Sequence, residues 1–157
     1  MMPGTRLGPY LLLERIGEGG FGTVFLAIIA GLLIGGTVNS LLVMNSAALI
    51  PPPEGFDLNT QEGLQAAMAV MEPKHFLIPF LAHALGTLVG AFVTAKIAAS
   101  YRFLLAMVIG FSFFVGGTYM VSILAAPMWF NVTDLILAYF PMAWLGAKFA
   151  GVSPKLK

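Results

Sequence analysis

The side chains best suited to chemistry in this sequence are two histidines and two acids, Glu72, His75, His83 and Asp134. His83 lies in a long apolar segment after Lys74, where nine residues of helix would carry it about 14 Å into a membrane. Ionisable groups at that depth are costly and mark proton relays, ion pathways and ligand sites. The sequence therefore predicts an outward-facing polar pocket built from these four residues.

Such a pocket would carry protons, bind a divalent metal or hold a small ligand. The residues lack the H-E-x-x-H pattern of a metalloprotease, which argues against a zinc enzyme. The alternative is structural: Glu72, His75 and Asp134 are solvated or cap helix ends, and His83 hydrogen-bonds to a polar neighbour in a bundle. The candidates for that neighbour are Asn39, Thr87, Ser112 and Thr118.

The composition indicates that a membrane protein carries these residues. Of the 157 residues, 59% are hydrophobic and 10% are charged, whereas soluble chains carry about 25% charged residues. The net charge of +1 and the scattered Lys and Arg residues argue against a nucleic-acid partner. With no cysteine, the chain forms no disulfide and has no thiolate nucleophile or metal ligand.

Four apolar segments are candidates to cross a hydrocarbon core of about 30 Å as helices. Three consecutive prolines, residues 51–53, end the first segment, and Pro141 predicts a kink in the last. Between the first two segments, residues 60–71 have the apolar spacing of a short amphipathic helix on the membrane surface. We therefore expect an all-α polytopic membrane protein with four transmembrane helices and an amphipathic helix in the outer loop. The expected spans are residues 23–50, 75–99, 103–124 and 133–150, within a transmembrane domain of residues 23–151 that precedes a cytoplasmic tail of residues 152–157.

Lys and Arg residues are distributed unequally between the two sides of this predicted bundle. If the N-terminus is cytoplasmic, the outer side holds Lys74 alone. The positive-inside rule then predicts that both termini are cytoplasmic, with the lipid bilayer as the main partner. The inner side holds Arg6, Arg15, Lys96, Arg102, Lys148, Lys155 and Lys157.

Small residues recur at every fourth position in the first two spans. Because lipid tails provide no hydrophobic drive between helices, such ridges mark faces where helices approach closely. This pattern favours, as the leading function, a structural or accessory membrane protein that acts by helix association, in a homo-oligomer or a larger membrane complex. The ridges include Gly31, Gly35 and Asn39 in the first span and Ala82, Gly86 and Gly90 in the second.

A motif of a different kind precedes the first span. Gly17, Gly19, Gly22 and Val24 form the pattern G-x-G-x-x-G-x-V. With its flanks, residues 7–27, it resembles the first strand, glycine-rich loop and second strand of bacterial serine/threonine protein kinases. The resemblance implies that the three glycines would cover the ATP phosphates and that the valine would contact the adenine.

The rest of the kinase machinery is missing from the sequence. No lysine occurs between Arg15 and Lys74, and no His-Arg-Asp, Asp-Phe-Gly or Ala-Pro-Glu motif is present. We interpret residues 1–22 as a kinase-like segment that does not fold by itself, left by a gene fusion or a misplaced start. We therefore expect no catalytic residues and no cofactor. A truncated receptor-like kinase is the rival interpretation.

Three further stretches, residues 51–55, 71–76 and 79–92, carry a second resemblance. Through them, residues 28–151 are similar to small four-helix bacterial inner-membrane proteins of unassigned activity. The resemblance implies a fold and a location in the bacterial inner membrane, but no mechanism. The sequence thus leaves three functions open: an accessory membrane protein, a carrier or sensor that uses the polar pocket, and a kinase fragment.

Overall fold

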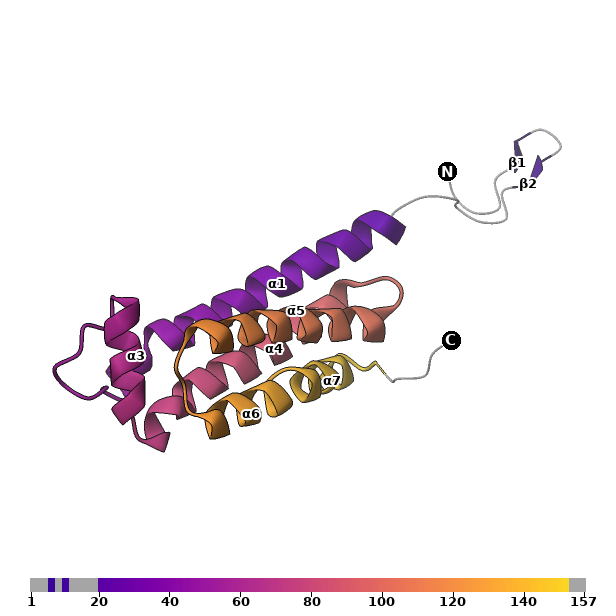
Figure 1. Cartoon of the computed structure of the whole chain (residues 1–157). Helices are drawn as coiled ribbons and strands as arrows, with labels where there is room; N and C mark the ends of the chain where they lie inside the picture. Colours follow the sequence, from indigo (N-terminus) through magenta and orange to yellow (C-terminus); the bar gives the residue numbers. More distant parts are fainter. Residues whose placement is uncertain (1–5, 8–9, 12–19, 153–157) are drawn as a thin grey trace.

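The long apolar segments form three helices of more than twenty residues each, α1 (Gly20–Met44), α4 (Leu77–Ile97) and α5 (Arg102–Ile123). The computed structural model describes residues 6–7, 10–11 and 20–152, and in it these helices lie side by side (Figure 1). Each is long and apolar enough to cross a membrane, α4 together with the turn before it. The protein is therefore helical, with three candidate membrane-spanning helices.

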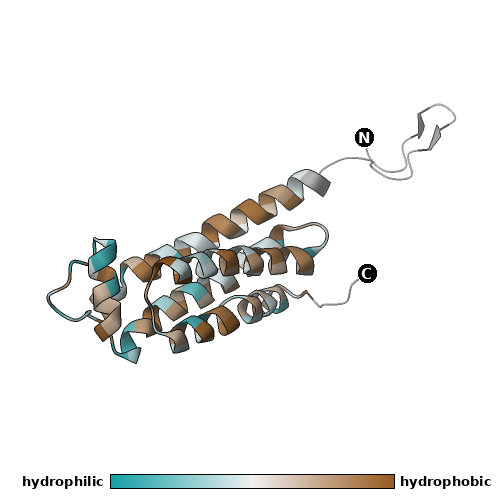
Figure 2. Ribbon diagram, in the orientation of Figure 1, coloured by the Kyte–Doolittle hydropathy of each residue, from teal (hydrophilic) through white to brown (hydrophobic). Residues whose placement is uncertain are grey.

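Three short helical elements connect α1 to α4: α2 (Ser46–Leu49), α3 (Gln61–Val70) and the 3-10 turn η1 (Pro73–Phe76). The sequence predicts a helix at residues 60–71, and α3 occupies nearly the same range. Thr60 caps its N-terminus, since the threonine hydroxyl accepts a hydrogen bond from the third residue of the helix at 3.1 Å. Figure 2 shows that α3 and the neighbouring loop are more hydrophilic than the long helices.

The fourth predicted span, residues 133–150 with a kink at Pro141, is not one helix. The chain forms two ten-residue helices instead, α6 (Met128–Leu137) and α7 (Phe140–Phe149). Pro141 has no N–H to donate to the carbonyl group four residues earlier, so an uninterrupted helix would lose a hydrogen bond there. Each helix rises about 15 Å, roughly half of a hydrocarbon core.

The first predicted span, residues 23–50, is also divided. The helix α1 ends at Met44, and Asn45 separates it from α2. The side-chain amide of Asn45 donates to the carbonyl oxygen of Leu41 at 2.7 Å, an interaction that competes with the regular helical pattern. The second and third spans agree with the prediction to within two residues at each end.

The helices α1 and α4 contact each other through their glycines. A Cβ atom placed on Gly35 would lie 2.5 Å from the carbonyl oxygen of Gly86, and one placed on Gly90 would lie 2.7 Å from that of Gly31. Ala82, on the same ridge of α4, is fully buried. The two predicted ridges therefore face each other, because only residues without side chains allow the backbones to approach this closely.

The same device holds α7 against α4. A Cβ atom on Gly146 would lie 2.5 Å from the carbonyl oxygen of Leu88. At the end of the bundle, Arg102 donates from Nε to the carbonyl oxygen of Ala95 at 2.6 Å and from its terminal nitrogen to that of Ala150 at 3.2 Å. One guanidinium group thus satisfies carbonyl groups at the C-terminal ends of both α4 and α7, where the helix dipoles favour positive charge.

The glycine contact predicts that Gly86→Ala destabilises the fold. The added methyl group would lie 2.8 Å from the carbonyl oxygen of Gly35 and 2.9 Å from the Cβ of Asn39. We expect a loss of roughly 1–3 kcal/mol, the usual cost of overpacking, measured by thermal unfolding in detergent. Gly36→Ala is the matched control, because its Cβ meets nothing within 4 Å. Equal stability of the two variants would contradict the packing argument.

Candidate functional site

An acid and a histidine meet inside the bundle. Nδ1 of His83, on α4, lies 2.8 Å from Oδ1 of Asp134, on α6. Only 4% of the Asp134 side chain is exposed, against 23% of the His83 side chain. The hydroxyl of Tyr139 donates to the other carboxylate oxygen, Oδ2, at 2.8 Å. Both oxygens of an ionised Asp134 are therefore hydrogen-bonded, and the hydrogen of a neutral imidazole ring resides on Nδ1.

Tyr139 reaches this position because the chain is broken between α6 and α7. The ring of Tyr139 packs directly on Gly117 of α5, where a Cβ atom would lie 2.6 Å from the phenolic carbon Cζ. On its other sides the ring stacks on that of His83 at 6.0 Å and meets Phe114 edge-on at 6.0 Å. Sequence analysis missed Tyr139; the available signal was its position two residues before Pro141.

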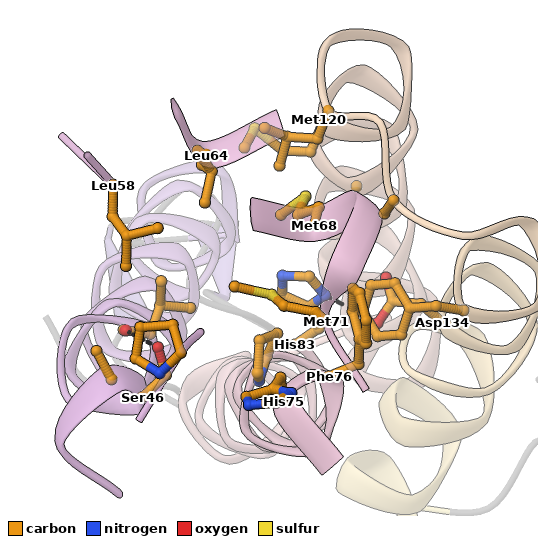
Figure 3. A pocket seen from close by; sticks show the side chains of 18 of the residues that line it. Ser46, Leu58, Leu64, Met68, Met71, His75, Phe76, His83, Met120 and Asp134 are labelled. Carbon is orange, nitrogen blue, oxygen red and sulfur yellow. Dashed lines mark hydrogen bonds and ion pairs between the residues drawn. The ribbon is translucent and has the colours of Figure 1, made fainter. Parts of the chain in front are cut away.

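His83 and Asp134 lie in the wall of a cavity of about 520 Å³, a size typical of small-molecule sites. Residues of α1, α3, α4, α5 and α6 line it, and most of them are apolar. Figure 3 shows the imidazole ring of His83 near Met71, with its hydrogen bond to Asp134 drawn as a dashed line. The methionines of the wall are Met44, Met68, Met71 and Met120.

Two polar groups of the cavity wall have no hydrogen-bond partner among the described residues. Since Nδ1 of His83 is bonded to Asp134, the remaining ring nitrogen, Nε2, is available. The amide of Asn39, on α1, also makes no hydrogen bond within the described part of the chain, and its Oδ1 atom is buried. Buried polar groups normally have partners, so the unpaired Oδ1 of Asn39 points to a ligand, and Nε2 of His83 is a second polar atom that such a ligand could contact.

The four polar neighbours that the sequence offered as partners for the His83 side chain do not bond to it. The hydroxyl of Thr87 donates to the backbone carbonyl oxygen of His83 at 2.8 Å, not to its ring. Ser112 and Thr118 donate to carbonyl groups of their own helix. The polar partner of the His83 side chain is therefore Asp134 and none of these four residues.

Glu72 lies apart from the His83 group and does not line the cavity. Its carboxylate is exposed and pairs with Lys74 at 3.0 Å. The hydrogen bond and the charge of Lys74 hold the pKa of Glu72 below its usual range. The four predicted residues therefore do not form one cluster.

His75 does line the cavity, but both of its ring nitrogens are occupied by backbone groups. Nδ1 accepts a hydrogen bond from the N–H of Glu72 at 3.0 Å. Nε2 lies 3.1 Å from the carbonyl oxygen of Pro51 and, as the protonated nitrogen, donates to it. Of the four predicted residues, His83 and Asp134 bond to each other in the cavity wall. Nε2 of His83 is their one polar side-chain atom there without a hydrogen-bond partner among the described residues.

The kinase-like motif is only partly described. Gly17 and Gly19 lie outside the described residues, whereas Gly22 and Val24 lie in α1. Residues 23–27, which the resemblance assigns to a second strand, are helical. The described strands, β1 (Arg6–Leu7) and β2 (Tyr10–Leu11), pair in antiparallel register. The part of the motif that can be described is therefore the start of a membrane helix.

No three His, Asp or Glu side chains lie close enough to share a metal ion in the portion of the chain that the structure covers. No family model matches the sequence, and the curated proteins and solved structures give no match either. The features of the molecule that indicate a function are therefore His83, Asp134, Tyr139 and the cavity beside them.

The geometry predicts that Asp134 fixes the tautomer of His83. When the ring of His83 is neutral, ¹⁵N spectra of histidine-labelled protein should show the hydrogen on Nδ1 and none on Nε2. Asp134→Leu removes the acceptor, so we expect a mixture of tautomers. Tyr139→Phe keeps the carboxylate and should leave the His83 tautomer unchanged. The chain has two histidines, so His75 serves as an internal control for folding.

Proposed function

We propose that the protein is a small integral membrane protein of the bacterial inner membrane with four crossings and both termini in the cytoplasm. Two observations support this topology. The two ten-residue helices α6 and α7 rise about 15 Å each, enough together for a fourth crossing in two halves. Arg102 and the C-terminal turns of α4 and α7, which carry Lys96 and Lys148, lie at one end of the bundle. The loop with α3 lies at the other end (Figure 1).

This topology predicts opposite reactivity of two engineered cysteines. The native chain has none, so each variant carries a single thiol. In spheroplasts, a membrane-impermeant maleimide should label Glu54→Cys, which is exposed before α3. It should label Ser100→Cys, exposed in the turn between α4 and α5, only after the membrane is permeabilised. The reverse pattern would contradict the orientation.

We further propose that the cavity binds a small molecule and that binding is linked to protonation of His83. The observation that carries this proposal is the hydrogen-bonded group of His83, Asp134 and Tyr139 in the cavity wall. Protonation adds a hydrogen to Nε2, so the atom that faces a ligand changes from an acceptor to a donor.

The surroundings of His83 leave few other groups that could respond to pH. Asp134 and Tyr139 contact it directly, and His75 of η1 lines the same cavity. The described lining residues of α1, α3 and α5 include no acid, histidine, lysine or arginine. A buried charged group is also a poor way to stabilise a fold, because well-packed apolar residues often do so equally well. The group is therefore better explained by a proton-linked role than by packing.

The proton-linked role predicts a step in stability or ligand binding with pH. We expect the unfolding temperature of the purified protein, measured over a series of pH values, to show one step that belongs to His83. The step should be absent from His83→Gln and present in His75→Gln, the matched control. A step that survives in His83→Gln would overturn the assignment.

A structural or accessory role is the second candidate. It is favoured by the face of α1 turned away from α4, which exposes large apolar side chains, Phe25 and Leu33 among them. The ridge of Gly31 and Gly35, however, is already occupied by α4 and is not free for another protein. A pH response that is flat in the wild-type protein would favour this second candidate.

A further inference from the structure

We propose that the ligand of the cavity is a neutral apolar molecule that carries a hydroxyl group, such as a lipid alcohol, and that this hydroxyl donates a hydrogen bond to Nε2 of His83. The inference rests on the proposed function of the cavity and names the chemical class of its ligand.

The cavity walls determine the apolar part of the ligand. Most of its lining side chains are aliphatic, aromatic or methionine. Methionine side chains are flexible and polarisable, and they adapt to apolar ligands of different shape. Met68 of α3 and Met120 of α5 line the cavity from two elements, and Met71, just after α3, lies near His83 (Figure 3). Such walls fit a hydrocarbon chain or ring system.

The two polar groups without partners determine the head group. Neutral His83 presents Nε2 as an acceptor, because its hydrogen lies on Nδ1 toward Asp134. Asn39 presents a carboxamide, which can donate or accept after a half-turn of its end group. A hydroxyl group that reaches both side chains would satisfy them once the amide has turned, because it donates to Nε2 of His83 and accepts from Nδ2 of Asn39.

Other head groups fit this site less well. A carboxylate or phosphate diester has no hydrogen to donate to Nε2, and its charge would lie near that of Asp134. An ammonium group would bring a positive charge into a cavity whose walls are mostly apolar, which costs desolvation free energy. A hydrocarbon leaves both polar groups unsatisfied, which costs free energy in a buried site.

The test uses the full-length protein with ¹⁵N-labelled histidines in phosphatidylcholine nanodiscs. Dodecan-1-ol is compared with dodecyl methyl ether, which has the same oxygen but no hydrogen to donate. We expect the alcohol to shift the Nε2 resonance of His83 saturably, while the ether leaves it in place. The His75 resonances should not move, because both of its ring nitrogens are bonded to the backbone.

Two variants test the head-group contact. Asn39→Ala removes the amide and keeps the Cβ that packs against Gly86. It should weaken dodecan-1-ol binding about tenfold, the equivalent of one hydrogen bond. Ser46→Ala is the control: the serine lines the cavity, but its hydroxyl is already bonded to the carbonyl oxygen of Val43 at 2.7 Å, so binding should not change.

Three results would overturn the inference. Equal shifts of the His83 Nε2 resonance with the alcohol and the ether would indicate partition into the bilayer. Dodecylamine is the third probe, and a shift with this amine alone would indicate a cationic ligand. No shift with any of the three probes would exclude the whole ligand class. The pH step of His83 in the absence of any probe is measured separately, so failure of the ligand class is distinguishable from failure of the proton-linked function.

Discussion

The structure depends on satisfying one carboxylate in an apolar interior. Asp134 has 4% of its side chain exposed, and a carboxylate so buried needs hydrogen bonds to both oxygens. His83 supplies one from α4, and Tyr139 supplies the other from the break between α6 and α7. This requirement ties the two halves of the last apolar segment to the centre of the bundle. It also fixes which nitrogen of His83 carries the hydrogen, and so which atom faces the cavity.

The glycine contacts explain why a cavity exists beside this group. Where Gly31 and Gly35 of α1 face Gly86 and Gly90 of α4, the two backbones are so close that no side chain fits between them. Asn39 marks the end of this tight contact: its Cβ packs near Gly86, and its amide lines the cavity. Beyond it, the chain continues through α2 and α3, and the side chains of α3 close the space. Gln65 holds α3 there by donating to the carbonyl oxygen of Ile123, at the end of α5, at 2.7 Å.

Local signals in the sequence predicted the long helices and their packing faces. The spans that became α4 and α5 end at short polar segments, and hydropathy alone located their ends to within two residues. The four-residue spacing of small residues predicted the packing faces of α1 and α4, and the structure shows that these two faces meet each other. The structure of the fourth segment was harder to predict, because hydropathy is averaged over a window of residues and does not detect where a helix is interrupted. Pro141 predicted a kink. It did not predict that the helix would stop, or that the hydroxyl of Tyr139 would bond to Asp134 in the interior.

The sequence by itself determined that this is a helical, membrane-compatible chain with an ionisable histidine far inside an apolar segment. These properties follow from composition and from the period of an α-helix, which are local. Only the tertiary structure decided the partners: His83 with Asp134, Asp134 with Tyr139, and Glu72 with Lys74 instead of the cavity. His83 and Asp134 are 51 residues apart along the chain. No local pattern encodes such a contact, because it depends on how α6 packs against α4 and on where the chain breaks.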